Sequence, residues 1–210
     1  MPYHEHPFQI LKIHNETPKK ELNQLCKIGV LHKCSDSQWA SPSFIIPKKN
    51  GTVQFVTDFQ RVNKKIVCKP FPIPKINDLI QKLKGFTWAT ALDLNMGYYH
   101  LRLDPDAQKI CTIVFLWGKY QYLHLPMGIN CAPDIFQEQM YKVMSGLDFV
   151  KTYLNNLLMM TSDMLDNHLC KLTLVLDQPH ANGLKVNAEK STFCTMEIKY
   201  LGYWITQNGI

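Results

Sequence analysis

The sequence lacks the features that mark membrane-spanning, secreted and zinc-binding proteins. No apolar run approaches the ~18 residues that a membrane span needs, and the N-terminus has no apolar core typical of a signal peptide. The seven cysteines are an odd number, and no two of them form a CxxC pair. This pattern predicts reduced thiols in an intracellular protein of the cytoplasm or nucleus, and argues against a disulfide framework or a zinc site.

What is present is a chain that can build a core and is moderately basic. Of its 210 residues 46% are hydrophobic, enough for one or two compact domains. Lys and Arg number 23 against 17 Asp and Glu, which gives a formal net charge of +6. A basic surface suits a polyanion such as nucleic acid, although an ordinary soluble protein that happens to be basic fits the charge equally well. The end at Ile210, soon after a strand-like run, is expected to be a cut through a longer polypeptide.

Hydrophobic periodicity and turn residues predict helices mixed with short strands. An amphipathic helix is expected over 17–31, with Gly29 as its C-terminal stop. Its core-facing residues would be Leu22, Leu25, Cys26 and Ile28. Strands at 43–47 and 53–57 flank Asn50-Gly51, a strong hairpin signal. Further helices are expected near 75–83, 134–144 and 163–181, and further strands near 87–94, 112–117, 119–125, 149–154, 157–160, 193–195 and 199–206.

The class that follows is α+β with antiparallel sheet, because these strands pair through hairpins more than through crossovers. The segment 98–103 fits either a helix or a bent strand. Asp93 lies near the end of the buried strand at 87–94, where an acid is either a satisfied turn or cap residue or a metal ligand.

One expected hairpin tip combines good turn chemistry with poor metal chemistry. Residues 153–156 read Tyr-Leu-Asn-Asn, and Asn tolerates the left-handed backbone of a tight turn. Asn is neutral, however, and Mg²⁺ prefers carboxylate oxygens. We expect Asp93 and this turn to lie on one sheet surface, which places a lone acid next to an Asn pair.

Seven motif-like runs follow one another along the chain. They lie at 39–49, 69–76, 91–99, 125–128 with 132–137, 153–156, 183–187 with Lys190, and 200–203. In this order they closely resemble the reverse transcriptase region of gypsy-type LTR retrotransposon polyproteins. The resemblance implies an α+β right-hand polymerase with fingers, palm and an antiparallel palm sheet, and with the thumb absent. RNase H and integrase regions would be missing as well.

The resemblance also assigns regions to the chain. Fingers would occupy 1–90, palm 91–117, a fingers/palm return 118–145, and palm with the primer-grip strands 146–210. The implied partners are an RNA or DNA template-primer and a dNTP.

Members of this family hold two Mg²⁺ ions with three aspartates, and the ions activate the primer hydroxyl and steady the pyrophosphate. Asp93 matches the first aspartate, with the Leu94 carbonyl assisting, whereas Asn155 and Asn156 stand at the other two. Magnesium binding is therefore expected to be impaired. Lys190 resembles the lysine proposed to protonate pyrophosphate, although an ordinary exposed lysine is the alternative.

The resemblance implies further site residues, and Phe136 and Gln137 are expected to support the palm. The nucleotide-binding positions would be Lys48, Gln54, Leu94, Tyr98, Met127 and Gly128, and the primer grip would contain Leu201, Gly202 and Tyr203. For Tyr98, packing in the palm is the alternative to screening the sugar.

Other departures from the family pattern point the same way as the Asn pair. Gln54 and Gln60 stand where the family usually carries Arg, which removes a charge and a bidentate fork. Pro179 falls inside a predicted helix, where it costs about 3 kcal/mol. Asp-to-Asn and Arg-to-Gln changes each arise from one G-to-A change, so a decayed genomic copy is the hypothesis. Deliberate inactivation is the rival, but it explains only the two asparagines.

Three functions follow from these residues. The first is an active RNA-directed DNA polymerase, which the Asn pair disfavours. The second is an inactive pseudoenzyme that still binds nucleic acid, and the third is a translated fragment with no selected function. The sequence favours an inactive copy and does not separate the second from the third.

Overall fold

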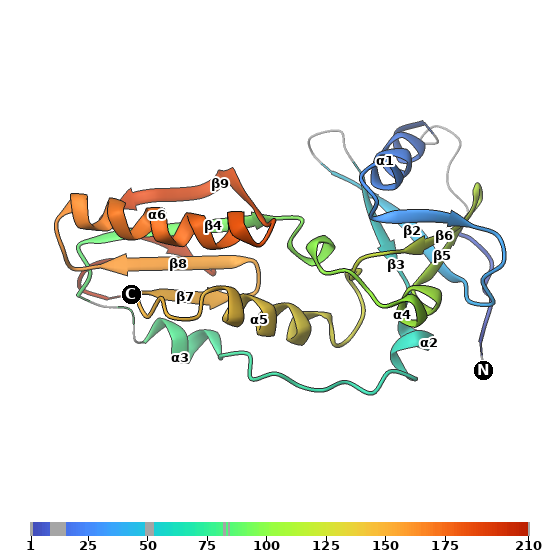
Figure 1. Ribbon diagram of the computed structural model, residues 1–210, viewed down its shortest axis with the longest axis horizontal. Helices are drawn as coiled ribbons and strands as arrows, with labels where there is room; N and C mark the ends of the chain where they lie inside the picture. Colours follow the sequence, from blue (N-terminus) through green and yellow to red (C-terminus); the bar gives the residue numbers. More distant parts are fainter. Residues whose placement is uncertain (1, 9–15, 49–52, 82, 84, 210) are drawn as a thin grey trace. The chain divides into compact units, whose positions relative to one another are not determined.

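The computed structural model describes residues 2–8, 16–48, 53–81, 83 and 85–209. These residues form two compact units (Figure 1). Unit 1 contains residues 1–68 and 98–132, and unit 2 contains residues 69–97 and 133–210. The predicted Asn50-Gly51 turn lies outside the described residues.

Unit 1 is built on a five-stranded sheet in the order β1-β6-β5-β2-β3. Its strands are β1 (Leu31–Cys34), β2 (Ser41–Pro47), β3 (Val53–Thr57), β5 (Thr112–Phe115) and β6 (Gly118–Tyr122). Its helices are α1 (Glu16–Lys27), α2 (Gln60–Asn63) and α4 (Pro105–Ile110). Neighbouring strands are antiparallel except β2 and β5, which pair in parallel through Ser41 and Ile113. The sheet is therefore mixed, although its hairpins are those the sequence predicts.

The first helix is shorter than predicted. It ends at Lys27, and Val30 N–H closes its end on the Leu25 carbonyl at 2.9 Å. Gly29 has a φ of +78°, as its role as a stop requires. The prediction of helix up to Leu31 is wrong because Leu31 starts β1, which pairs with β6. Leu22 and Leu25 are buried as predicted and Cys26 is half-buried, but Ile28 is exposed and the prediction that it faces the core is wrong.

Two short elements settle what the sequence left open or missed. The segment that fitted helix or strand begins as a 3-10 helix, η2 (Gly97–His100). The unpredicted α4 has Asp104 as its N-cap, whose Oδ1 accepts from Asp106 N–H at 2.9 Å and Ala107 N–H at 3.0 Å. Pro105 fits the first turn because its missing N–H would lack a partner there.

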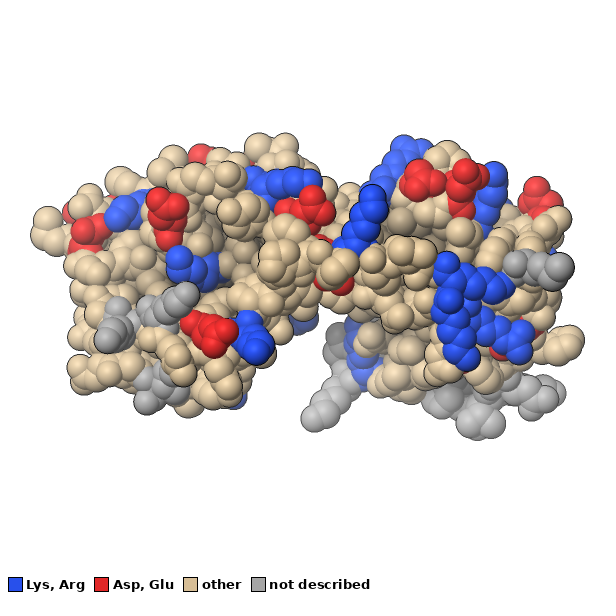
Figure 2. Space-filling model, turned by 90° about the horizontal axis from the view of Figure 1, so that it is seen from below, with Lys and Arg blue, Asp and Glu red and all other residues tan. Residues whose placement is uncertain are grey.

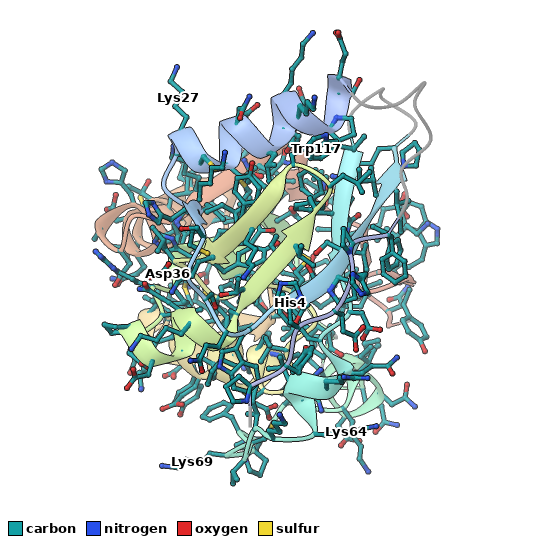
Figure 3. The ribbon with its side chains drawn as sticks, turned by 90° about the vertical axis from the view of Figure 1, so that its right-hand side faces the viewer. His4, Lys27, Asp36, Lys64, Lys69 and Trp117 are labelled. Carbon is teal, nitrogen blue, oxygen red and sulfur yellow. The ribbon has the colours of Figure 1, made fainter. Side chains whose placement is uncertain are left out.

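Aromatic side chains fill much of the unit 1 core. Tyr122 is buried, with the Tyr99 ring stacked at 6.1 Å. At the tip between β5 and β6, Trp117 lies beside α1, whose Lys19 ammonium is 5.6 Å from the indole centroid (Figure 3). Burial raises the pKa of the Cys111 thiol to about 12, so this cysteine is a packing residue and not a reactive thiol.

Unit 2 is built on a four-stranded antiparallel sheet in the order β7-β8-β4-β9, with a separate hairpin. The sheet strands are β4 (Trp88–Asn95), β7 (Val150–Tyr153), β8 (Asn156–Thr161) and β9 (Lys185–Thr195). The hairpin is β10 (Ile198–Tyr200) and β11 (Tyr203–Ile205), and the helices are α3 (Ile76–Ile80), α5 (Ala132–Val143) and α6 (Leu165–Ala181). The antiparallel sheet of the α+β prediction is confirmed here.

Helix α6 packs on β4, β8 and β9 through a buried histidine (Figure 1). The His168 ring accepts or donates at both nitrogens: Nε2 lies 2.8 Å from the Thr90 hydroxyl of β4, and Nδ1 lies 2.8 Å from the Thr161 hydroxyl of β8. Burial, and then the nearby Lys171 charge, lowers the pKa of His168. A neutral histidine thus joins two strands to the helix.

Pro179 lies inside α6, as predicted, but in its last turn. The proline ring is buried, and the Pro179 carbonyl accepts from Asn182 N–H at 3.1 Å and Leu184 N–H at 2.8 Å. A proline this close to the helix end removes one internal hydrogen bond and leaves the termination intact.

Candidate metal site and nucleic-acid surface

The register of β4 and β8 places Asp93 directly opposite Asn156. The next residue, Leu94, is buried and donates its N–H to the Asn155 carbonyl at 2.9 Å. The expected juxtaposition of the lone acid and the Asn pair is therefore observed. It follows from strand pairing, because both segments lie at the same end of neighbouring strands.

The three side chains hydrogen-bond to one another. Asn155 Nδ2 donates to Asp93 Oδ2 at 3.1 Å, and Asn156 Nδ2 donates to Asn155 Oδ1 at 3.3 Å. An ionised carboxylate only accepts hydrogen bonds, so the Asn155 amide must present its NH₂ group to Asp93. The acid is thus partnered by an N–H donor.

These residues do not fit a hard divalent cation. Mg²⁺ requires oxygen ligands and favours carboxylates, whereas Asp93 is the single carboxylate here and one amide oxygen is already used as an acceptor. Within the described ranges no three His, Cys, Asp or Glu side chains gather in a way that would hold a metal ion. The donor set supports hydrogen bonding in place of ion binding.

The turn itself is built differently from the expectation. Tyr153 pairs with Asn156, so the two-residue loop is Leu154-Asn155. The left-handed backbone falls on Leu154, with a φ of +50°, and not on either asparagine. The expectation that the Asn pair supplies this backbone is wrong, because the register shifts the loop by one residue. A left-handed non-glycine residue costs about 1–2 kcal/mol, so something else must hold the turn.

The side chain of Gln137 in α5 holds the Leu154-Asn155 turn in place. This side chain is 2% exposed. Oε1 accepts from Leu154 N–H at 2.7 Å, while Nε2 donates to the Thr152 carbonyl at 3.2 Å and hydroxyl at 3.1 Å. These bonds fix both sides of the turn. The role of Gln137 in supporting a palm stays a prediction, and the sequence signal for it is its place in the motif at 132–137.

A glycine lets the neighbouring residue of α5 pack closely. A Cβ on Gly97 would lie 2.6 Å from Cζ of Phe136, whose ring is fully buried. The end of the β4 segment therefore rests on the same helix that holds the Leu154 turn.

Strand β9 reaches Asp93 through a serine that sequence reasoning missed. Ser191 Oγ accepts from Asp93 N–H at 3.1 Å and donates to the Asn187 carbonyl at 2.6 Å. The pairing of β4 and β9 is interrupted by a bulge between the Asp93 and Ala91 pairs. Lys190 lies on this bulge, exposed, with its backbone N–H 3.3 Å from Asn187 Oδ1.

The predicted primer-grip residues form the tip of the β10–β11 hairpin. Leu201 and Gly202 have φ values of +49° and +90°, the signature of a type I′ turn. Tyr203 and Trp204 are exposed. Directly beside the tip, the Tyr200 hydroxyl donates to the Asn156 carbonyl at 3.4 Å, and burial raises the Tyr200 pKa.

The residues predicted to bind nucleotide divide between the two units. Leu94 belongs to unit 2, whereas the other five belong to unit 1. Lys48 and Gln54 are exposed, and Tyr98 is half-buried against the unit 1 core, which agrees with packing. Met127 is 52% exposed.

The loop at Gly128 is held by an asparagine that sequence reasoning did not single out. Gly128 has a φ of +97°. Asn63 Nδ2 donates to its carbonyl at 2.8 Å, and Asn63 Oδ1 accepts from Asn130 N–H at 2.9 Å. Asn63 is therefore a candidate positioning residue for the Met127-Gly128 loop.

The net positive charge belongs to unit 1. Unit 1 contains 13 Lys and Arg against 7 Asp and Glu, a balance of +6, whereas unit 2 contains 10 of each. Exposed cations follow one another along and after α2, at Arg61, Lys64 and Lys65. Figure 2 shows Lys and Arg side chains gathered on one face of this part of the molecule. Arg61 also pairs with Glu5 at 2.6 Å.

Sequence comparison decides the family. The sequence profile of the family described as reverse transcriptase (RNA-dependent DNA polymerase) matches residues 46–205. The chain belongs to this reverse transcriptase family. The retrovirus-related Pol polyprotein from transposon opus of Drosophila melanogaster is 32% identical over 199 residues, covering 91% of this chain and 20% of that polyprotein. A putative enzymatic polyprotein of Cassava vein mosaic virus is 30% identical, covering 91% of this chain and 30% of its own length.

Solved reverse transcriptases share the fold. The foamy viral protease-reverse transcriptase in complex with double-stranded DNA superimposes with a TM-score of 0.92 at 22% identity, over 100% of this chain and 44% of that one. The structure of the foamy viral enzyme in complex with an RNA/DNA hybrid gives a TM-score of 0.91 at 21% identity, and the match covers 98% of this chain and 28% of that one. The gypsy-type resemblance, with fingers and palm covered, is confirmed. The chain is thus a reverse transcriptase domain of the retrotransposon polyprotein kind, and it spans less than half of each of these relatives.

Among the helices that the structure describes, none is long and apolar enough to cross a lipid bilayer.

Proposed function

We propose that this domain is a catalytically inactive reverse transcriptase palm and fingers that retains nucleic-acid binding. The observation that carries the proposal is the hydrogen bond from the Asn155 amide to Asp93, at 3.1 Å. It puts a donor against the acid that a metal ion would need.

The loss of chemistry follows from charge. Two carboxylates held beside Asp93 would supply the negative field that binds two divalent ions, and the amides of Asn155 and Asn156 supply none. Removing a single preorganised electrostatic group commonly lowers a rate on the order of 10²–10³-fold. Replacing two metal ligands is expected to lower it at least as far.

Retained binding is supported by charge and by family. The net charge of +6 belongs to unit 1, including exposed Lys48 and Lys64, and phosphate contacts dominate nucleic-acid affinity. Neutral Asn155 and Asn156 also remove repulsion towards a phosphate backbone. The solved relatives in complex with double-stranded DNA and with an RNA/DNA hybrid have the same fold.

Primer extension tests the inactive site. The chain and its Asn155→Asp, Asn156→Asp variant are each given a primed RNA template, dNTPs and Mg²⁺, both alone and within a longer polypeptide that includes a downstream thumb. We expect no extension by the chain in either form, and extension by the variant in the longer form. Mg²⁺-dependent extension by the unaltered sequence would overturn the proposal.

The salt dependence of binding tests the proposal that the domain retains nucleic-acid binding. A labelled primer–template should bind the chain at low salt, with a logarithmic slope against salt that reports the released counterions. Binding should be the same in EDTA as in Mg²⁺. Absence of binding at low salt contradicts retained nucleic-acid binding and favours a fragment with no selected function.

A further inference from the structure

A cleft in unit 2 is lined by residues other than Asp93, Asn155 and Asn156. Its volume is about 740 Å³, within the range of ordinary ligand pockets. The lining residues come from the proline-containing segment at 71–74, from α3, from α5 and the loop that follows it, and from β7. Its floor is apolar, made by Leu79, Met144 and Val150, all of them buried.

The walls of the cleft are held in place without a ligand. Pro72 and Pro74 restrict the backbone of their segment. Phe71 N–H donates to Asp134 Oδ1 at 2.9 Å, which ties that segment to the first turn of α5. On the opposite side the Gln137 and Thr152 side chains bond to each other. A cleft preformed in this way spares a ligand the entropy of ordering its site.

Two aromatic rings stand at the cleft. The Phe71 and Tyr141 ring centroids are 6.0 Å apart with their planes inclined at 53°. Tyr141 is 65% exposed, so its ring face is open to a ligand. Inclined aromatic faces attract a cation through their quadrupoles.

The charges of the lining also favour a cationic ligand. Asp78 and Asp148 bring two exposed carboxylates, and Lys151 brings one ammonium. The Lys151 ammonium lies 3.3 Å from the backbone carbonyl of Asp148, its acceptor. The lining is therefore net acidic, around an apolar floor and two aromatic faces.

From this combination we infer that the cleft binds a small molecule with an apolar, aromatic body and a protonated amine. The body fills the floor over Leu79, Met144 and Val150, and the ammonium lies at the rim near Tyr141 and the carboxylates of Asp78 and Asp148. This site does not include Asp93, Asn155 or Asn156, although Gln137 and Thr152 of its lining also hold the neighbouring turn, and the inference does not rest on nucleic-acid binding.

A matched pair of fluorescent probes tests the inference. Dansylcadaverine carries an aromatic body and a primary ammonium, and its N-acetyl derivative has the same body without the charge. Dansylcadaverine should bind the chain saturably, with a dissociation constant on the order of 10–100 μM for a ligand of this size. The acetylated probe should bind about 3–10-fold more weakly.

Variants locate the site. Asp78→Asn with Asp148→Asn should weaken dansylcadaverine binding about 3–10-fold, and Tyr141→Ala about 2–5-fold. Lys151→Gln should tighten it about 2-fold, a direction that misfolding does not produce. The control is Asp166→Asn on the first turn of α6, which should leave binding unchanged.

Several results would overturn the inference. One is the absence of saturable binding at probe concentrations up to millimolar. Another is equal affinity for the two probes. The third is an effect of Asp166→Asn on binding as large as that of the double variant. If the double variant fails to show a cooperative thermal transition, the probe comparison and Lys151→Gln decide the question.

Discussion

Unit 1 and unit 2 of this reverse transcriptase domain differ in net charge and in the candidate site residues that they contain. Unit 1 contains the whole net charge of +6, and unit 2 is balanced with 10 residues of each sign. Unit 2 contains Asp93, Asn155 and Asn156, the positions of the candidate metal site, and Gln137 holds the turn beside them. The charge that would attract a polyanion and the candidate metal positions thus belong to separate units, and under the proposed function the first is retained while ion binding is lost.

The largest expected effect comes from removing the support of the unit 2 turn. Gln137→Leu deletes three hydrogen bonds of a buried side chain and leaves the Leu154 N–H without its acceptor. At about 1 kcal/mol for each bond, the free energy of unfolding should fall by about 3 kcal/mol. Urea titration measures it. Gln24→Leu, on the exposed side of α1, is the control and should change stability by less than about 0.5 kcal/mol.

The charge difference between the units predicts a difference in nucleic-acid affinity. Neutralising Lys48 and Lys64 of unit 1 to Gln should weaken primer–template binding about 10-fold and reduce the salt slope by about 2. The same change at Lys75 and Lys142 of unit 2 should alter binding less than about 3-fold. Fluorescence anisotropy at several salt concentrations measures both, and equal effects in the two pairs would mean that the charge asymmetry does not direct binding.

Acid should weaken unit 2 through its buried histidine. The pKa of His168 is lowered in the folded state, so the unfolded chain, with a pKa of about 6.5, takes up the proton first. Stability is therefore complete above about pH 6.5 and falls as the pH drops below it, by up to about 1.4 kcal/mol for each pH unit. Thermal unfolding between pH 7.5 and 5.5 measures the loss. His180→Gln, at an exposed position, should keep the same slope, and His168→Gln should flatten it.

The smallest expected effect on stability distinguishes the backbone strain of the Leu154-Asn155 turn from the contribution of its side chains. Leu154→Gly relieves the left-handed backbone at φ +50° and should raise the free energy of unfolding by up to about 1 kcal/mol. Gly202→Ala at φ +90° should lower it by a similar amount. Equilibrium urea unfolding of both variants is the measurement. A loss of stability in Leu154→Gly would show that the leucine side chain contributes more than its backbone conformation costs.

How far the sequence predicts this structure depends on the range of the interactions involved. Local signals predict the strand that ends near Asp93 and the hairpin that contains Asn155 and Asn156, whereas the facing of the two depends on the long-range pairing of β4 with β8. No local signal predicts the left-handed backbone of Leu154, because the glutamine that accepts its N–H lies 17 residues earlier. Strand β1 is not predicted, and the predicted helix includes its first residue, Leu31, because the four residues of β1 pair with β6, far along the chain. The bonds of Ser191 and Asn63 are long-range in the same way.

The cleft of unit 2 illustrates the same limit. Its prolines belong to the motif at 69–76 that the sequence shows, but its apolar lining comes from segments more than 60 residues apart. Motif resemblance located the polymerase positions without describing this cleft, because the motifs mark chemistry and the cleft is a product of packing.

The hydrogen bond between Asn155 and Asp93 bears on how such a domain evolves. An ancestral site with three acids close together repels itself whenever its ions leave, and the rest of the fold must offset that repulsion. In the inactive domain that we propose, exchanging two of the acids for amides removes two ion ligands and replaces repulsion between carboxylates with a hydrogen bond from Asn155 to Asp93. Under that proposal, the loss of activity is expected to raise the free energy of unfolding at this point, and restoring the acids is expected to lower it.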